Sequence, residues 1–369
     1  MRAGAALLAV LLLALACAPA ASPAAPAPAA SAAAAPAGAP SSPPAAAPTV
    51  APAAPALTTL KVGLLYVFLD AGVFIGIERG YFREQGLDLD LAKFNSATDF
   101  LPALAAGQLD IGGGGINAGL LNAVARGIAV KIVADKGINS PGHGNWLVLR
   151  RDLADSGKVR EVADLRGEAV AVVSEQSAGA MAFDHEMQRA GLRLADLNTV
   201  VLGFPEINGA LANGRIAAAN QVEPFATVGV RQGILTKWKG MDEVLPNQHV
   251  AVLLYDQAIG AERHGLGDRF MVAYLKGVRD WVDAMDHDRG RDQVVDIMMR
   301  YTPLQDRTLF DDMSPAGLNP DGYINFDSVA RDVRWYVDNG YMDQPIDVHA
   351  IVDHSHVDYA LGVLGRYQQ

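Results

Sequence analysis

Four consecutive glycines, Gly112 to Gly115, follow a short apolar run and precede a segment with a helical pattern. Gly113, Gly115 and Ala118 match the G-x-G-x-x-A pattern of dinucleotide-binding strand–turn–helix units. Asp135 follows about twenty residues later, where such units place an acidic residue. The glycines therefore open the possibility of a nicotinamide-dependent oxidoreductase.

Other features of the chain weigh against a dinucleotide. The strand before the glycines is very short, and the chain begins like an exported protein, whereas nicotinamide cofactors are scarce outside the cytoplasm. No Gly-Lys-Ser/Thr follows, which excludes a Walker phosphate loop. We interpret the glycines as a wall without side chains at the carboxyl end of a parallel strand, where ligands of open α/β sheets bind, and expect no cofactor.

Histidines gather near the C-terminus in the segment DVHAIVDHSHVDY. His349, His354 and His356, with Asp353, are residue types that bind metal ions. No two of these histidines are four residues apart, as a helical metal-binding pair requires. We therefore predict a solvated polar segment and no metal site.

The first residues have the pattern of an export signal. Arg2 precedes an apolar run that ends at Cys17, the only cysteine, and the run is too short to span a membrane. Residues 13–17 (LALAC) are similar to a bacterial lipobox, although Ala14 stands where leucine is preferred. We expect residues 1–17 to be a signal peptide ending at a lipidated Cys17; the alternative is ordinary secretory cleavage.

Residues 18–56 consist almost wholly of Ala, Pro and Ser. Such a stretch cannot bury enough apolar surface to offset its ordering entropy, so we predict a disordered, extended tether. About 310 residues follow it. That length favours two lobes over one small core. The net charge of −11 argues against binding to nucleic acid.

Strand and helix patterns alternate along this part, which predicts parallel sheets covered by helices. The expected strands are 60–67, 87–94, 109–112, 130–134, 168–173, 198–204 and 216–222, and the expected helices are 73–85, 96–107, 117–127, 178–190, 207–213, 268–286, 292–300 and 326–339. ALAAGQL (103–109) recurs as ALANGRI (210–216), each a helix end, a glycine and a strand start. The recurrence suggests two lobes of similar topology.

The order of motifs resembles a known family. GVFIGIERGYFREQGLDLDL, ALAAGQLDIG, VADLRGEAVAV and ALANGRI followed by EPF are similar to segments of the solute-binding proteins for sulfonate, taurine, nitrate and thiamine precursors. The resemblance runs from about Leu60 to Tyr255. It implies an α/β fold of the type II periplasmic-binding-protein class, with two lobes joined by a two-stranded hinge. Ala217 departs from the family, which usually has aspartate there.

The resemblance also implies an organisation and partners. Residues 57–149 would form the first part of lobe 1, 150–249 lobe 2, and 250–369 the return into lobe 1 with C-terminal helices. The protein would be a monomer, exported to the periplasm or the outer face of the cytoplasmic membrane, and held to the membrane by a lipid anchor. It would capture a small solute and deliver it to an ABC permease and its ATPase, without catalysis. A sensor role is the alternative.

Candidate solute-binding residues are the polar, aromatic and glycine residues at the carboxyl ends of the strands, which face the cleft in this fold. They are Tyr66, Phe68, Asp70, Asn95, Ser96, Gly114, Gly115, Asn117, His143, Asn145, Ser174, Ser177, Asn208, Asn220 and Glu223. For each of them, a helix cap or a turn is the alternative role.

The composition of these loops suggests the class of solute. The aromatic residues are Tyr66, Phe68, Phe74, Trp146 and Phe204, and they stand beside His143, asparagine amides and the carboxylate of Glu223. No Arg or Lys lies within the segments, although Lys136 is near. We predict a planar nitrogen heterocycle, such as a thiamine pyrimidine precursor or a riboflavin-like vitamin. An alkanesulfonate, taurine or nitrate is the alternative, because helix N-termini can bind anions without a cation. A pyrimidine-synthase-like enzyme would need a cysteine cluster that the chain lacks.

Overall fold

The computed structural model describes residues 56–304 and 306–368. The predicted signal peptide, Cys17 and nearly all of the tether lie outside these residues. Contacts divide the chain into Met1–Ala53 and Ala54–Gln369, and only the second unit is described below. None of the helices within the described ranges has the length and apolar character needed to cross a membrane.

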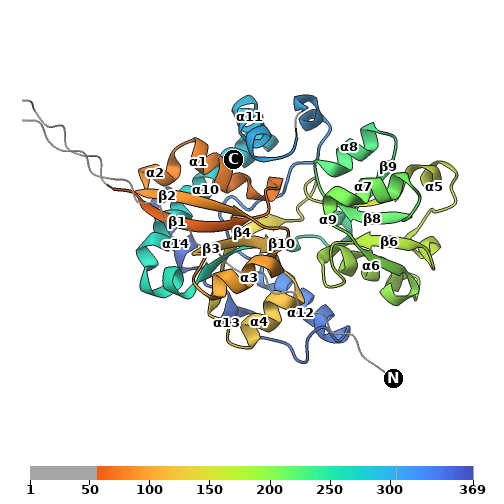
Figure 1. The fold of residues 1–369 in the computed structure, drawn as a ribbon, viewed down its shortest axis with the longest axis horizontal. Coiled ribbons are helices and arrows are strands. Elements are labelled where there is room, and N and C mark those ends of the chain that lie inside the picture. The colour runs from red at the N-terminus through yellow and green to blue at the C-terminus, as the bar shows by residue number, and fades with distance from the viewer. Residues whose placement is uncertain (1–55, 305, 369) are drawn as a thin grey trace, which may run out of the picture. The chain divides into compact units, whose positions relative to one another are not determined.

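The described residues form two five-stranded sheets covered by helices (Figure 1). The first sheet has the strand order β2-β1-β3-β10-β4, and the second has the order β7-β6-β8-β5-β9. The strands of the first are β1 (Thr58–Leu64), β2 (Leu87–Lys93), β3 (Ile111–Gly115), β4 (Val130–Ile138) and β10 (His249–Asp256). Those of the second are β5 (Trp146–Arg150), β6 (Ala169–Val172), β7 (Asn198–Val201), β8 (Ala218–Gln221) and β9 (Leu235–Gly240). The predicted two-lobed α/β fold is confirmed.

Both sheets are mixed, not purely parallel as predicted. β10 runs antiparallel to β3 and β4, and β5 runs antiparallel to β8 and β9. Each crossing leaves one sheet at its carboxyl edge and enters the other at its carboxyl edge: Trp146 at the start of β5 pairs with Gln221 at the end of β8. The strand that follows a crossing must therefore run in the opposite direction. β5, β9 and β10 were absent from the sequence-based prediction, and the chain has entered the second sheet by Trp146.

Helices cover both faces of each sheet. Against the first sheet pack α1 (Ala71–Glu78), α2 (Tyr81–Glu84), α10 (His264–His287), α11 (Arg291–Tyr301) and α14 (Ser355–Leu364) on one side and α3 (Ala97–Ala105), α4 (Ala118–Ala125), α12 (Phe326–Asp338) and α13 (Val348–Ile351) on the other. The second sheet carries α5 (Arg151–Asp155), α6 (Ala178–Arg189), α7 (Phe204–Ala212), α8 (Phe225–Arg231) and α9 (Met241–Val244). The predicted helix 73–85 is broken at Gly80, where φ is +77°.

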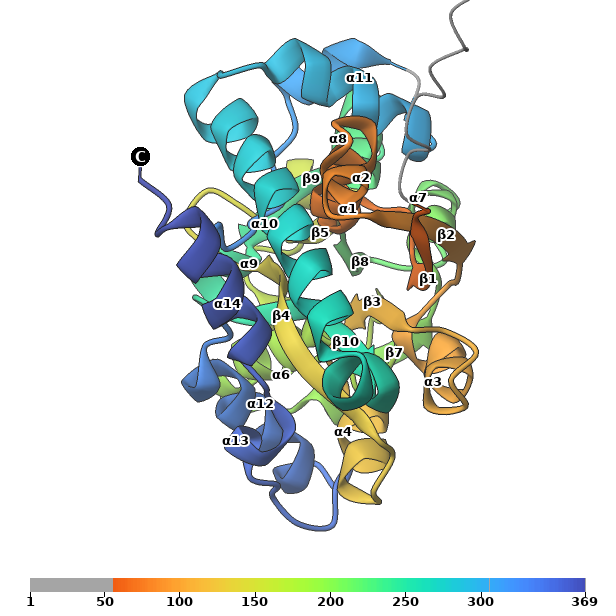
Figure 2. The ribbon, with the colours of Figure 1, turned by 90° about the vertical axis from the view of Figure 1, so that its left-hand side faces the viewer.

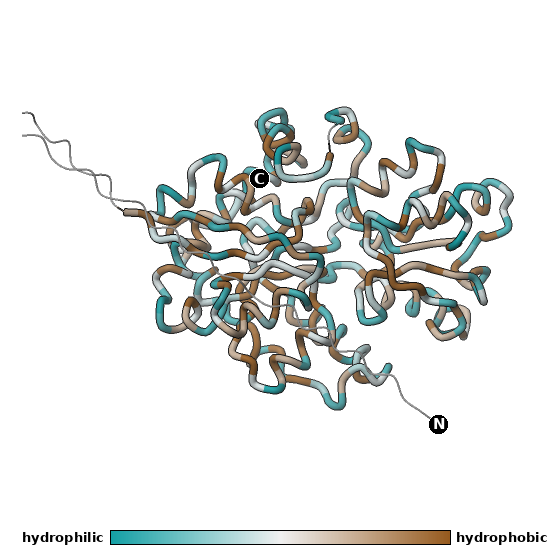
Figure 3. Tube along the Cα trace, viewed as in Figure 1, coloured by the Kyte–Doolittle hydropathy of each residue, from teal (hydrophilic) through white to brown (hydrophobic). Residues whose placement is uncertain are grey.

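Three clusters of buried apolar side chains hold these layers together. One lies between the first sheet and α1, α10 and α11, and one between the second sheet and α7 and α8. The third continues from α3 and α4 through α12 to α6, so it joins the two sheets. Figure 2 shows α10 crossing the first sheet with α14 beside it. In Figure 3 the hydrophobic segments lie mainly in the interior, along the strands, and the hydrophilic ones lie mainly in the outer loops.

Two segments cross between the sheets and pair with each other, as the prediction of a two-stranded hinge requires. The N–H of Asn139 donates to the C=O of Gln248 at 2.9 Å, and the N–H of Asn247 donates to the C=O of Asn139 at 2.8 Å. A third segment runs alongside, since the N–H of Ile138 donates to the C=O of Gly317 at 2.9 Å.

The glycine run forms strand β3, not a loop after a strand. A Cβ atom on Gly112 would lie 2.4 Å from Phe100 Cε2, and one on Gly113 would lie 2.6 Å from Lys136 Cε. Side chains of α3 therefore occupy one face of β3, and a lysine of β4 occupies the other. The glycines are explained by this close packing on both faces.

We expect Gly112→Ala to lower the free energy of unfolding by about 1–3 kcal/mol, because Phe100 is fully buried and must shift to admit a methyl group. Urea unfolding measures the effect. Gly209→Ala in the exposed part of α7 is the matched control, since no atom lies within 4 Å of its Cβ position; it should be neutral or stabilising. Equal stability of the Gly112 variant and the parent would contradict the packing argument.

A buried carboxyl group on α12, that of Asp332, contacts the hinge. Gln248 Nε2 donates to Asp332 Oδ1 at 3.1 Å. Burial raises the pKa of Asp332 to about 7, whereas the hydrogen bond from Gln248 and the nearby Arg331 act to lower it. Because the folded-state pKa exceeds the unfolded value, this group makes folding progressively less favourable as the pH rises from about 4 to about 7.

Asp332→Asn should remove that dependence. At pH 8 the variant should be more stable than the parent, by at most about 4 kcal/mol, and at pH 4 the two should be nearly equal. Urea unfolding at both pH values tests this, with Asp338→Asn, exposed at the end of the same helix, as the control. A difference that does not change with pH would rule out the titration of Asp332 as its source.

Candidate functional site

The candidate site lies at the edge where parallel strands of each sheet end. There Ser96, Asn117 and Ser177 are the N-cap residues of α3, α4 and α6. Their side chains accept hydrogen bonds, at 3.3, 2.8 and 3.2 Å respectively, from the backbone N–H three residues further on. Capping is thus the role that the structure gives these side chains. The remaining first-turn N–H groups have no partner within their own helix and can bind an anionic group.

The loop after β1 contains a strained residue. Tyr66 has a left-handed backbone with φ of 60°, which is uncommon for a bulky side chain. The centroid of the Tyr66 ring lies 5.4 Å from that of the Phe74 ring and 5.6 Å from Lys93 Nζ. Asn95 is exposed in the next loop. Strain of this kind is concentrated at ligand-binding and active sites, so Tyr66 stays a candidate.

Asp70 and Phe68, in the short helix η1 (Phe68–Asp70), belong to the core. Asp70 Oδ1 lies 2.7 Å from Lys136 Nζ, and both side chains are at most 1% exposed. Asp70 Oδ2 also accepts a hydrogen bond from the N–H of Val67 at 3.0 Å. The carboxylate is used within the protein, which corrects the expectation that Asp70 faces the solute. Because Lys136 is buried in this pair, the cation that the sequence places near the site loops is not available to bind a solute.

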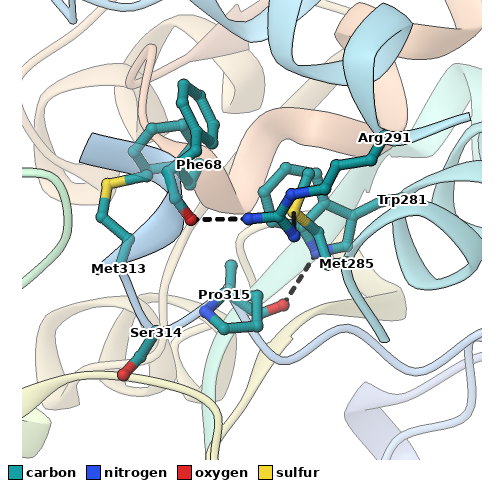
Figure 4. Close-up of a pocket in the computed structure, with 9 residues that line it drawn as sticks. Phe68, Trp281, Met285, Arg291, Met313, Ser314 and Pro315 are labelled. Carbon is teal, nitrogen blue, oxygen red and sulfur yellow. Dashed lines mark hydrogen bonds between the residues drawn. The ribbon is translucent and has the colours of Figure 1, made fainter. Parts of the chain in front are cut away.

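Phe68 lines a small cavity of about 20 Å³ with Trp281, Met313 and Ser314 (Figure 4). Polar groups in its wall are paired with each other. Trp281 Nε1 donates to the C=O of Ala316 at 2.9 Å, and the Arg291 guanidinium donates to the C=O of Phe310 at 2.6 Å. The cavity has room for about one water molecule and is too small for an organic solute.

The dinucleotide interpretation does not fit the geometry. Gly114 is buried in β3, where its Cβ would lie 2.7 Å from that of Ala97, and Gly115 ends the strand. Asp135, the residue in the ribose-binding position of that pattern, is 1% exposed. Its carboxylate lies 2.8 Å from His249 Nδ1 and accepts the N–H of Asn319 at 2.8 Å. It therefore stabilises the fold around the hinge.

The second sheet contributes a polar cluster at its carboxyl edge: Trp146, Asn220, Glu223 and Lys237. Asn220 Nδ2 donates to the C=O of Trp146 at 3.3 Å. Lys237 Nζ lies 2.6 Å from Glu223 Oε1 and 5.4 Å from the centroid of the Trp146 ring. Glu223 also accepts hydrogen bonds from the N–H and hydroxyl of Thr227, both at 3.0 Å. Among the described residues, the buried Trp146 Nε1 has no hydrogen-bond partner.

Lys237 was missed in the sequence analysis. It lies on β9, which was not predicted, and it reaches Glu223 only because β5 pairs with both β8 and β9. Ile234, Thr236 and Trp238, which have high β propensity and recur at every second residue, are the signal that could have found the strand. Lys237 Nζ also donates to the C=O of Asp312 at 3.1 Å, so the cluster contacts the segment that returns to the first sheet.

His143 and Asn145 lie in the first crossing segment. His143 Nε2 is 2.7 Å from Asp286 Oδ1, and this hydrogen bond raises the pKa of His143. Asn145 is half-buried, and its backbone C=O accepts a hydrogen bond from the N–H of Met241. This bond ties the end of the first crossing segment to the start of α9. Asp286 thus holds the His143 ring against the end of α10.

Ser174 and Asn208 make internal hydrogen bonds. The C=O of Ser174 accepts the Ser177 hydroxyl at 2.7 Å in the turn before α6. Asn208 Nδ2 donates to the C=O of Phe225 at 2.8 Å, and its Oδ1 accepts Gln221 Nε2 at 3.2 Å. Asn208 therefore ties α7 to α8 and β8.

A larger pocket of about 730 Å³ lies at the opposite edge of the first sheet. Its lining includes Lys131 at the start of β4, Asp256 at the end of β10, and the segment around Asp353. None of the predicted solute-binding residues lines it.

The C-terminal histidines are not uniformly solvated, contrary to the prediction. His349 is exposed, but His356 is 0% exposed, and burial lowers its pKa. His354 Nε2 accepts the N–H of Ile324 at 3.1 Å. Packing of α14 against α10 encloses His356, an effect that hydropathy alone does not indicate.

Comparison with known proteins shows the family and the fold of this chain. The family model described as the NMT1-like family matches residues 53–292. A search of curated proteins finds no match.

Several solved structures share the fold. The ligand-binding component of an ABC-type import system from Staphylococcus aureus, solved with zinc bound, is 18% identical with a TM-score of 0.68, covering 82% of this chain and 98% of that one. The alkanesulfonate-binding protein of Xanthomonas axonopodis pv. citri is 16% identical with a TM-score of 0.66, covering 82% and 100%. The nitrate-binding protein of Synechocystis PCC 6803 is 15% identical with a TM-score of 0.67, covering 85% and 90%. These matches confirm the periplasmic-binding-protein fold.

Loss of the buried cation tests the structural role of Asp70. Lys136→Met should lower the free energy of unfolding by about 3–5 kcal/mol, because it leaves a carboxylate buried without a partner. Adding Asp70→Asn should restore much of that loss, since the amide keeps an acceptor for Val67. Urea unfolding measures both variants, and Lys61→Met, at an exposed site in β1, is the control. A cost near that of the control would contradict the role of the pair.

Proposed function

We propose that this chain, which belongs to the NMT1-like family, is the solute-binding component of an ABC importer and binds a small anion of the sulfonate or nitrate type. The fold shared with three binding proteins supports the importer role. The single observation that carries the solute class is the lobe-2 cluster. There the Lys237 ammonium lies 5.4 Å from the centroid of the Trp146 ring, whose buried Nε1 has no hydrogen-bond partner among the described residues.

The solute would bind between the lobe formed by residues 57–149 and 250–369 and the lobe formed by 150–249. The protein would be an exported monomer that presents its solute to a permease driven by an ATPase. A lipid on Cys17 and a tether over 18–56 would keep it at the membrane. These assignments follow from the predicted export signal and from the shared fold.

The polar groups at the strand edges favour an anion because most of them donate hydrogen bonds. The N-termini of α3, α4 and α6 present backbone N–H groups. An ammonium has three donors, and Lys237 uses two of them on Glu223 and the C=O of Asp312. The indole of Trp146 adds a further donor. A sulfonate or nitrate offers three acceptor oxygens to such a set.

The planar heterocycle becomes the second candidate. It was predicted from aromatic side chains, but two of these, Phe68 and Phe74, belong to the core. The ring centroid of Phe68 lies 5.5 Å from that of Phe310, and the ring centroid of the fully buried Phe74 lies 4.4 Å from that of Tyr301. Tyr66, Trp146 and Phe204 are the predicted rings that remain for stacking at the site.

The test is a binding titration of the purified full chain by isothermal calorimetry. The probes are taurine, ethanesulfonate and nitrate on one side, and the thiamine pyrimidine and riboflavin on the other. We expect binding of at least one anion, and an affinity lower by about 10- to 100-fold in Lys237→Met and in Trp146→Phe, each of which removes a donor while keeping side-chain bulk.

Lys158→Met is the matched control, because Lys158 lies in lobe 2 and is exposed. Binding of a heterocycle with no response to the anions would replace the proposed solute class. Anion binding that is unchanged in both site variants would place the anion elsewhere on the molecule.

A further inference from the structure

Three metal-ligating side chains meet on the far side of the first sheet, outside the proposed solute site. They are His264 and Asp268, one turn apart at the start of α10, and His356 on α14. One ligand atom from each lies within 4.8 Å of the others. Asp268 Oδ1 is 2.7 Å from His356 Nδ1, and its Oδ2 is 3.1 Å from His264 Nδ1.

The packing holds His356 in place. Its ring lies 4.9 Å from that of Tyr255, whose hydroxyl donates to the C=O of Gly267 at 2.9 Å. A Cβ on Gly267 would lie 2.7 Å from His356 Cε1, so a glycine is needed there for the ring to reach Asp268. Figure 2 shows the two helices side by side. The donor set is therefore preorganised by the core.

The ring of His356 has one polar atom that the fold does not explain. His356 is 0% exposed, and its Nε2 has no hydrogen-bond partner among the described residues. A buried polar atom without a partner costs free energy. The His264 side chain, by contrast, is 43% exposed, so an ion can reach the cluster from solvent.

We propose that His264, Asp268 and His356 form a binding site for a divalent transition metal ion, with Zn²⁺ as the best fit. Two imidazoles and one carboxylate suit zinc, whereas Ca²⁺ and Mg²⁺ prefer sets made only of oxygen. Tetrahedral zinc with bonds of about 2.0–2.1 Å needs donor atoms about 3.3 Å apart, so small side-chain rotations bring the three donors into place.

The structure also has a side chain that can orient His264 and space for a further ligand to the ion. His264 Nε2 lies 3.3 Å from Ser355 Oγ, a contact that can fix the ring when Nδ1 is the ligand. The segment before His264 and Asp353 line the pocket of about 730 Å³. A water or an acidic group entering from that pocket would complete the coordination.

The test is metal binding to the full chain after treatment with a chelator. We expect about one equivalent of Zn²⁺ by calorimetry, a visible d–d spectrum with Co²⁺, and a thermal midpoint raised by Zn²⁺ but not by Mg²⁺ or Ca²⁺. His264→Ala and Asp268→Asn should each weaken binding by at least about tenfold and abolish the Co²⁺ spectrum. Both positions lie near the helix start, so these variants should fold, and a cooperative thermal unfolding transition without metal verifies it.

His287→Ala, a histidine in the last turn of the same helix, is the matched control and should bind zinc as the parent does. Zinc binding and a Co²⁺ spectrum that persist in both site variants would overturn the proposal, as would no binding by the parent chain. In those cases the cluster is a carboxylate bridging two imidazoles by hydrogen bonds. The result is independent of solute binding, which uses other residues.

Discussion

Gly112, Gly113 and Gly114 of strand β3 leave no room for side chains, and much of the first lobe depends on that constraint. Phe100 of α3 occupies one face of the glycines, and the aliphatic part of Lys136 occupies the other. The ammonium of Lys136 is thereby brought within 2.7 Å of Asp70 in a region without solvent. A buried charge without a partner is costly, so the lysine, the carboxylate and the glycines require one another.

This arrangement links the site loop to the hinge. Asp70 receives the N–H of Val67, next to the strained Tyr66, so the ion pair positions the loop that follows β1. Lys136 lies on β4 just before Asn139, where the chain crosses to the second sheet. Its neighbour Asp135 holds His249 at the start of the return strand. The residues that surround one buried charge pair thus define both the edge of the first sheet and its crossings.

The second lobe meets that edge with donors. Because β5 enters the sheet at its carboxyl edge, Trp146 stands beside the end of β8, and its ring centroid lies 5.4 Å from Lys237 Nζ of β9. Glu223 and the C=O of Asp312 hold the ammonium in position at low exposure. Preorganised N–H groups of this kind bind an anion without rearrangement, which is the physical basis of the proposed solute class.

Local patterns in the sequence determined the parallel strands, the longer helices and the caps at Ser96, Asn117 and Ser177, because these depend on periodicity and on hydrogen bonds within a few residues. The order of motifs was sufficient to indicate the two-lobed fold. Tertiary structure alone decided that Asp70 is buried, that Lys237 joins Trp146 and Glu223, and that His264 and His356 meet across Asp268. Each of these contacts joins segments far apart in the chain, and burial and charge pairing at such contacts depend on packing, which no local pattern records.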